Sequence, residues 1–287
     1  MAPLKIAIPN KGRLSDSCLQ LLRAIGLPVA GVGRTLVSVV AGGAVEILFS
    51  RADDIPEFID LGAADIGLTG SDLVDEAAAD VETLLALDFG LCKLVVAVPE
   101  HSLMKKIEDV PDAAVVATAF PQLTRRYFEA HGKKLTVVAV SGATEITPYI
   151  GVADLITDLA ETGSTLRKNH LTPIATICDV RAVLIGNRRK CAEKEKEVHE
   201  IVAAMASVIA AKEKRYLMAN VPKQALDEVR RLLPGISGPT VMNLAGGDGM
   251  VAIHSVVAER AINGLMPPLK KLGATGILVL PIERMVL

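Results

Sequence analysis

The chain has 287 residues, a length typical of about two domains and sufficient to bury a hydrophobic core without disulfides or a structural metal. Hydrophobic residues make up 51% of the chain and charged residues 22%, which excludes wholesale disorder. A formal net charge of -2, with aromatic residues at only 3%, argues against nucleic acid or an anionic membrane as a partner.

Short apolar stretches alternate with helical ones over the first 90 residues. The spacing predicts strands over residues 4–8, 45–49 and 65–70, and helices over residues 15–25 and 54–62. Strands that alternate with helices favour a mostly parallel α/β sheet.

A second α/β unit follows. Strands are predicted over residues 92–98, 114–118 and 136–140, a helix over 121–131, and a turn at 142–148 that leads into a helix. Residues 188–215 place charged clusters around an alanine-rich stretch, which indicates one long amphipathic helix, or two, bridging to the next module.

Residues 216–287 form a third piece. Strands are predicted over residues 216–219, 251–257 and 276–280, with helices over 222–233 and 258–272. This βαββαβ-like order is the ferredoxin-like pattern, which is common in appended ligand sensors.

The four cysteines lie far apart, and their spacing matches neither a zinc site nor a disulfide framework. The first eleven residues lack the apolar run of a signal peptide, and the longest apolar run, residues 201–211, is too short to span a bilayer. We therefore expect a cytoplasmic protein.

Residues 153–169 carry the most informative motif. An apolar strand delivers Asp158 and Glu161, and the small-residue turn Thr162-Gly163-Ser164-Thr165 follows at once. Such a turn offers main-chain N–H groups and three hydroxyls to a phosphate, and the acids suit ribose hydroxyls or a divalent metal bound with phosphates. The alternative is an ordinary helix N-cap, since serine and threonine are frequent caps.

Charged residues also follow three predicted strands. Lys11 and Arg13 come after the first strand, Arg51 after the second and Asp72 after the third. In an open α/β sheet, ligands bind beyond the carboxyl ends of the strands, so these side chains favour one cleft for a polyanion such as a diphosphate. Each charge taken alone is weak evidence, and a solvated basic turn is the more common interpretation of an isolated Lys-Gly-Arg.

Several common signatures are absent from the sequence. There is no P-loop, Gly31-Val32-Gly33 lacks the third glycine of a dinucleotide fingerprint, and no nucleophile is paired with a base. Cys92 lies in an apolar strand, which favours a place in the core.

Six segments, taken together, resemble the ATP phosphoribosyltransferase family over essentially the whole chain. They are IAIPNKGRL (residues 6–14), FSRADDIPEFI (49–59), ADIGLTGSDL (64–73), SGATEITP (141–148), GVADLITDLAETGSTLRKNHL (151–171) and TGILVLPIERMVL (275–287). The fifth is the most specific, and the last resembles the regulatory end of the family's long form.

The resemblance implies a fold and a reaction. The expected fold is a two-lobed, periplasmic-binding-protein-like α/β core with a C-terminal ferredoxin-like (ACT-like) regulatory domain. Lobe I would span residues 1–90, completed by about 177–210, lobe II would span 91–176, and the regulatory domain 212–287. The reaction would join ATP and 5-phosphoribosyl 1-diphosphate (PRPP), with Mg²⁺, into N1-(5-phosphoribosyl)-ATP and diphosphate, the first step of histidine biosynthesis. Histidine would inhibit it, and the chain would form homo-oligomers from dimers to hexamers.

Site residues carry over by motif. The turn Thr162, Gly163, Ser164 and Thr165 would hold the 5-phosphate of PRPP, with Asp158 near its ribose and Glu161 at a more variable position. Residues that would line the cleft for ATP or diphosphate are Lys11, Arg13, Arg51, Asp72, Glu145 and Asp154.

In the regulatory domain, Thr240, Ser255 and Ala274 are the candidate histidine contacts. The loop Gly246-Gly247-Asp248-Gly249 is richer in glycine than the family pattern, which places the strength of inhibition in doubt.

Two other functions are compatible with parts of the sequence. A non-catalytic two-lobed binding protein for a small phosphorylated or anionic ligand would share the fold, but the acids before the turn and the absence of a signal peptide argue against it. A transcriptional effector domain would need a basic helix-turn-helix, and the sequence carries none at either end.

Overall fold

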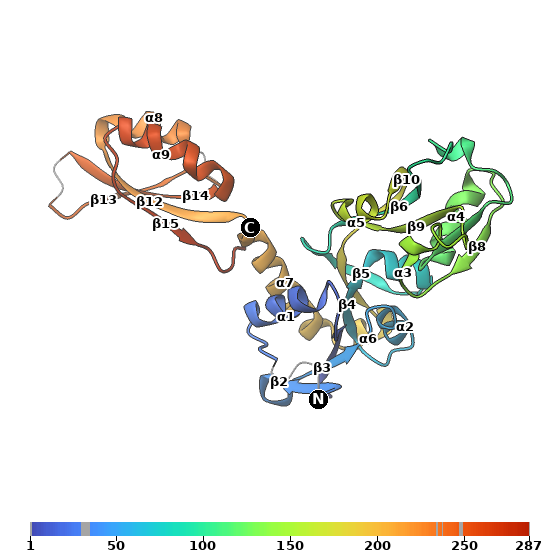
Figure 1. The fold of residues 1–287 in the computed structure, drawn as a ribbon. Coiled ribbons are helices and arrows are strands. Elements are labelled where there is room, and N and C mark those ends of the chain that lie inside the picture. Colours follow the sequence, from blue (N-terminus) through green and yellow to red (C-terminus); the bar gives the residue numbers. More distant parts are fainter. Residues whose placement is uncertain (1, 30–34, 234, 237, 247–248, 287) are drawn as a thin grey trace. The chain divides into compact units, whose positions relative to one another are not determined.

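The computed structural model describes residues 2–29, 35–233, 235–236, 238–246 and 249–286, which form three β-sheets with flanking helices (Figure 1). The chain divides into two compact units, residues 1–202 and residues 203–287. The first unit holds two sheets, one in each lobe, and the second unit holds the third sheet.

The sheet of lobe I has six strands. Their order is β2 (Val37–Val40), β3 (Val45–Ser50), β1 (Leu4–Pro9), β4 (Ile66–Gly70), β11 (Ala182–Gly186) and β5 (Glu82–Ala86). β1 runs parallel to β3 and β4, whereas β2, β11 and β5 are antiparallel to their neighbours. The expectation of a mostly parallel sheet is therefore wrong, because the short connection after β2 forms a hairpin and β11 enters the sheet in reverse from lobe II.

Helices cover this sheet. They are α1 (Ser15–Ala24), α2 (Ile55–Asp60), α3 (Ser71–Ala77) and α6 (Arg188–Glu193), followed by α7 (Glu195–Lys212), and η1 (Ala41–Gly43) is a 3₁₀ turn. Ile55 and Ile59 of α2 pack against Ala7, Val183 and Ile185, so one apolar cluster joins the helix to β1 and β11. Residues 188–212 thus form two helices separated at Lys194.

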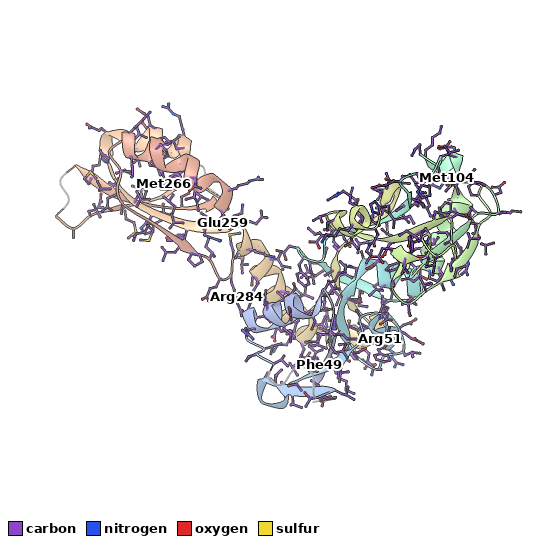
Figure 2. All side chains as sticks on the ribbon, viewed as in Figure 1. Phe49, Arg51, Met104, Glu259, Met266 and Arg284 are labelled. Carbon is purple, nitrogen blue, oxygen red and sulfur yellow. The ribbon has the colours of Figure 1, made fainter. Side chains whose placement is uncertain are left out.

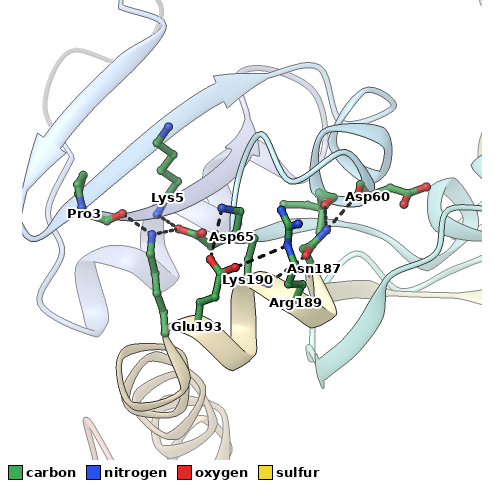
Figure 3. A network of polar contacts seen from close by, with 10 residues as sticks. Pro3, Lys5, Asp60, Asp65, Asn187, Arg189, Lys190 and Glu193 are labelled. Atoms are coloured by element: carbon green, nitrogen blue, oxygen red, sulfur yellow. Dashed lines mark hydrogen bonds and ion pairs between the residues drawn. The ribbon is translucent and has the colours of Figure 1, made fainter. Parts of the chain in front are cut away.

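Lys194 is the C-cap residue of α6, and its side chain belongs to the network of polar contacts around Asp65 (Figure 3). Its ammonium donates to Asp65 Oδ2 at 2.6 Å and to the Pro3 carbonyl at 2.7 Å. The same Asp65 oxygen accepts from the Lys5 N–H at 2.7 Å, so one buried carboxylate ties β1, β4 and the α6–α7 junction together. Asn187 caps α6 by accepting from the Lys190 N–H at 3.0 Å.

The sheet of lobe II has five strands. Their order is β10 (Leu171–Val180), β6 (Cys92–Pro99), β9 (Leu155–Ala160), β7 (Val115–Thr118) and β8 (Thr136–Ala139). Its helical elements are η2 (Ile107–Asp109), α4 (Pro121–Ala130), η3 (Thr144–Ile146) and α5 (Ser164–Lys168). Phe128 of α4 and Leu166 of α5 belong to two separate apolar clusters, to which alternate residues of β6 contribute.

The helix expected after residues 142–148 is only the 3₁₀ turn η3. Pro148 follows it, and Gly151 adopts a φ of 72°, in the left-handed region that ends helices. The chain then enters β9, which leads directly to the small-residue turn.

The second unit is a βαββαβ domain. Its sheet order is β13 (Thr240–Asn243), β14 (Met250–Ala258), β12 (Lys214–Pro222) and β15 (Thr275–Pro281), all antiparallel. Its helical elements are η4 (Lys223–Ala225), α8 (Leu226–Leu232), η5 (Glu259–Ala261) and α9 (Ile262–Lys271). Val229 of α8 and Leu269 of α9 pack with Leu217 and Ile253 on one face of the sheet (Figure 1). This confirms the ferredoxin-like expectation, and with the two α/β lobes it confirms the predicted fold class.

Candidate functional site

The turn 162–165 connects β9 to α5. Gly163 adopts φ 69° and ψ 8°, a left-handed conformation that favours glycine and that turns the chain into α5. The Thr162 hydroxyl donates to Ser164 Oγ at 3.1 Å, and Arg167 donates to the Thr162 carbonyl at 3.1 Å. Residues 159–166 line a cavity of about 110 Å³, so the turn encloses a space suited to a small group.

Hydroxyls and main-chain N–H groups are the functional groups of this turn. Thr162, Ser164 and Thr165 reach the surface, whereas Leu166 is buried and anchors α5 to the lobe II sheet. The first N–H groups of a helix have no acceptor within the helix, and in α5 the Ser164 N–H donates to Thr162 Oγ1 at 3.4 Å. Phosphate binding by this segment stays a prediction.

Asp158 lies on β9 just before the turn. Its Oδ1 accepts from the Leu159 N–H at 2.7 Å. The pKa of Asp158 is raised from 3.8 to about 6, mainly by burial and to a smaller extent by the nearby Glu145 carboxylate, while the hydrogen bond from Leu159 acts in the opposite direction. Glu145 and Asp158 are thus brought close enough to interact, although 13 residues separate them in the sequence.

The raised pKa of Asp158 predicts a pH-dependent stability. The folded carboxyl holds its proton more tightly than the unfolded one, so stability falls as the pH rises from about 4 to about 6. Asp158→Asn removes this titration and keeps an acceptor for Leu159. We expect the free energy of unfolding of the wild type, relative to this variant, to fall by about 2 kcal/mol between pH 4 and pH 7 in urea titrations. A difference that stays constant with pH would contradict the burial of the charge.

A buried cluster of three threonine hydroxyls lies behind Asp158. Thr157 is hydrogen bonded to Thr118 at 2.6 Å and to Thr124 at 2.6 Å, and the Phe120 N–H donates to Thr118 Oγ1 at 2.9 Å. These bonds join β9, β7 and the start of α4, so they hold the strand that presents Asp158.

Asp154 lies at the other end of β9 from the turn. Its Oδ2 accepts from the Val115 N–H at 2.8 Å, which ties the beginning of β9 to β7. The structure therefore does not group Asp154 with Asp158 and the turn.

The strand-end residues of lobe I share one edge of the sheet. β3, β1 and β4 are adjacent and parallel, so Arg51, Lys11 and Asp72 follow their carboxyl ends in that order. Lys11 is exposed, and Arg51, beside Phe49 in Figure 2, forms an ion pair with Asp53 at 2.8 Å. Arg51 is thus held over the turn that precedes α2.

Arg13 connects the carboxyl end of β1 with the crossing between the lobes. Its guanidinium donates to the Gly90 carbonyl at 2.9 Å and to Cys92 Sγ at 3.1 Å, and lies 3.6 Å from Asp72 Oδ2. Burial raises the pKa of the Cys92 thiol, which argues against a thiolate nucleophile at this position.

Asp72 is only 1% exposed at the start of α3. Its Oδ1 occupies the space that a Cβ on Gly70 would fill, so a larger residue at position 70 would displace the Asp72 carboxylate. Burial raises the pKa of Asp72, while Arg13 acts in the opposite direction. The ion pair with Arg13 therefore favours the charged form of this buried carboxyl.

A cavity of about 340 Å³ is lined by one predicted residue from each lobe. Arg13, Ser17 and Glu161 line it, together with the loop 88–91 that crosses from lobe I to lobe II. Arg13 and Glu161, which come from different lobes, thus face one space. The loop 88–91 and Ser17 were missed by sequence reasoning, although this loop falls at the predicted boundary between the lobes and could have been found there.

The candidate effector residues do not form one cluster within the second unit. Thr240 is the cross-strand partner of His254, so the two residues lie on the same face of the sheet. Ser255 follows His254 in the strand and therefore lies on the opposite face. Ser255 is 4% exposed, with no hydrogen-bond partner for its hydroxyl among the described residues, and Ala274 belongs to the apolar core. In the glycine-rich loop, Gly247 and Asp248 lie outside the described residues.

The acidic, histidine and cysteine side chains are dispersed over the two units. Within the described ranges, no three of them converge on a point that could hold a metal ion. None of the helices described above is both long and apolar enough to cross a membrane.

The fold and the cavity define a two-lobed α/β enzyme core that carries a separate ferredoxin-like domain. The family model "ATP phosphoribosyltransferase" matches residues 51–207, and "HisG, C-terminal domain" matches residues 211–284. The chain belongs to the ATP phosphoribosyltransferase family, in its long form. Its enzyme class is that of the glycosyltransferases.

Relatives match the chain almost from end to end. The ATP phosphoribosyltransferase of Methanothermobacter thermautotrophicus is 46% identical over 99% of both chains, and that of Methanocaldococcus jannaschii is 46% identical over 98% of this chain and 99% of its own. Among solved structures, the ATP phosphoribosyl transferase (HisG:HisZ) complex from Thermotoga maritima has a chain with a TM-score of 0.62 and 28% identity. That match covers 71% of this chain and 96% of the other.

Proposed function

We propose that the protein transfers the 5-phosphoribosyl group of PRPP to N1 of ATP and releases diphosphate, which would be the first step of histidine biosynthesis, in the cytoplasm. The observation that carries this proposal is the cavity between the lobes, where Arg13 faces Glu161 at the head of the turn. Glu161 also lines the smaller cavity of the turn 162–165, so a cation and a set of hydroxyls are available to a substrate that carries phosphate at both ends.

The two ends of PRPP are assigned to the two lobes. The turn 162–165 would hold the 5-phosphate, and the carboxylates of Asp158 and Glu161 would accept hydrogen bonds from the ribose hydroxyls. Lys11, Arg13 and Arg51 would bind the diphosphate or the phosphates of ATP. Asp72 would keep Arg13 in place, and Glu145 would approach the nucleotide from lobe II. For Asp154, the bond to Val115 supports a role in holding β9 in place.

The proposed reaction does not require a general base from the protein. The bond between ribose C1 and the diphosphate oxygen breaks, and a bond from adenine N1 to C1 forms. N1 carries a free electron pair at neutral pH, so no base has to remove a proton before it attacks. Positioning of both substrates and stabilisation of the leaving diphosphate by Arg13 and Lys11 would supply the catalysis.

Mg²⁺ fits this site as an ion held mainly by the substrate. Mg²⁺ commonly binds through one or two carboxylates together with substrate phosphates, and the described residues offer no closed cage of protein ligands. Asp158 and Glu161 would supply the carboxylates, and the bound ion would neutralise charge that develops on the leaving diphosphate.

Turnover of ATP with PRPP and Mg²⁺ tests the proposal, with diphosphate and the N1-substituted product measured directly. A pyrophosphatase in the assay prevents the reverse reaction. Formation of both products would support the transferase. Folded protein that binds PRPP without forming product would instead support a two-lobed binding protein.

Feedback inhibition by histidine is part of the same proposal, and the buried hydroxyl of Ser255 supports it. An unpartnered buried hydroxyl costs stability, so a ligand that bonds to it is one explanation for its presence. We expect Ser255→Ala to raise the histidine concentration for half-inhibition about tenfold while uninhibited turnover stays within about twofold.

Thr240→Val is the companion variant, since Thr240 lies on the other face of the sheet. Inhibition that is unchanged in Ser255→Ala but weakened in Thr240→Val would instead place histidine on the sheet face that carries Thr240.

We also propose that the chain assembles with copies of itself, from dimers to hexamers. The Thermotoga relative is described as a complex with a second protein, HisZ, and its chain matches only 71% of this one. Light scattering with and without histidine tests the assembly. A monomer under both conditions would exclude it.

A further inference from the structure

The two lobes are joined by a carboxylate of one and the helix start of the other. Glu76 lies on α3 of lobe I, and α4 of lobe II begins at Pro121. Glu76 Oε1 accepts from the Gln122 N–H at 2.8 Å, and Oε2 accepts from the Leu123 N–H at 2.9 Å. Both carboxylate oxygens of one side chain thus bind main-chain groups of the opposite lobe.

The amino-acid sequence at the start of α4 explains why an outside acceptor is required. The N-cap position is Phe120, whose side chain has no oxygen to accept from the first N–H groups of the helix. Pro121 at the first helical position has no N–H to satisfy. Glu76 therefore takes the role that a serine or aspartate N-cap would have, and does so from another lobe.

Two further contacts support the same junction. The Arg126 guanidinium donates to the main-chain oxygen of Asp75, and Leu73 packs against the apolar cluster that includes Phe120 and Leu123. The junction of α3 with α4 is thus both polar and apolar.

The opposite end of α3 reaches the candidate site. Asp72, at the first turn of α3, pairs with Arg13, which lines the cavity shared with Glu161. One short helix therefore contacts the cationic residue of lobe I at its start and the second lobe near its end.

We propose that Glu76 is a positioning residue, which clasps α4 and holds the lobes so that Arg13 and Glu161 face the same cavity. The clasp itself stands on the contacts above. Only its consequence for turnover rests on the proposed function.

Hydrogen exchange of the Gln122 and Leu123 amides tests the clasp directly in the full-length protein. We expect Glu76→Ala to speed their exchange about tenfold, because each loses a charge-assisted hydrogen bond. Asp75→Ala is the matched control, since it removes the same charge from the same helix but leaves its main-chain oxygen in place. Glu76→Gln, which retains one acceptor oxygen, should fall between the two.

Steady-state kinetics tests the positioning role. In Glu76→Ala we expect the KM for PRPP to rise about tenfold with kcat within about twofold, and Glu76→Gln to recover part of the loss. Faster exchange with an unchanged KM would overturn the positioning role, and exchange equal to that of Asp75→Ala would overturn the clasp. If the wild type shows no turnover, the proposed function fails, while the exchange data still decide the clasp.

Discussion

Replacement of Gly163 by valine is expected to lower the affinity for PRPP about a hundredfold in a protein that remains folded. A β-branched residue is strongly disfavoured at φ 69°, and a Cβ there would lie 3.1 Å from the Arg167 guanidinium. The turn would have to change its path, and the hydroxyls and main-chain N–H groups of residues 162–165 would move with it. Loss of about two charge-assisted hydrogen bonds corresponds to that change in affinity, which calorimetry with PRPP measures.

Gly132→Val provides the control for backbone strain. Gly132 has a φ of 70° and belongs to the same lobe, and a Cβ at this position would have no neighbouring atom within 4 Å. The backbone penalty is therefore similar, but the turn 162–165 is unchanged. We expect this variant to lose stability but to bind PRPP as the wild type does. Equal affinity in the two variants would show that the turn does not hold the phosphate.

Replacement of Lys194 by methionine is expected to destabilise the first unit by about 3–5 kcal/mol. The Asp65 side chain is 4% exposed and the Lys194 side chain 18%. Among the described residues, removal of the cation leaves this buried carboxylate with the Lys5 N–H as its remaining hydrogen-bond donor. Urea-induced unfolding, followed by circular dichroism, measures the loss as a lower transition midpoint.

Two further variants distinguish the effect of breaking the buried ion pair from the effect of removing any lysine. Lys196 pairs with Glu200 at 4.0 Å, with both side chains largely exposed, and Lys196→Met should cost less than about 0.5 kcal/mol. The double variant Asp65→Asn with Lys194→Met should recover part of the stability, because the unpaired charge is gone. Equal midpoints for Lys194→Met and Lys196→Met would contradict the role of the buried pair.

Local sequence patterns predicted most of the strands that are short, apolar and bounded by turn residues. β1, β3, β6, β7 and β14 lie within a few residues of the expected ranges. β10 was missed because two irregularities interrupt its pairing with β6, so its buried positions do not alternate. β11 was missed because it follows β10 almost at once and belongs to a different sheet.

The candidate site was predictable where its residues are neighbours in the sequence. Asp158, Glu161 and the turn 162–165 form one motif, and the structure keeps them together around β9. The contacts that depend on long separations were not predictable, such as Arg13 with the Gly90 carbonyl, 77 residues away. No pattern along the chain reports that Glu76 meets α4, because that contact exists only once two lobes have folded.

The position of β11 determines when lobe I can complete its sheet during synthesis of the chain. β5 lies at the edge of the lobe I sheet beside β11, and β11 follows the whole of lobe II in the sequence. Lobe II is continuous in sequence and can fold as soon as β10 has left the ribosome. Until β11 is synthesised, β4 and β5 each lack the strand with which they pair in the folded sheet. Lobe I therefore closes late around an insertion that is already folded, and the interval before β11 arrives is when its strands are most open to aggregation.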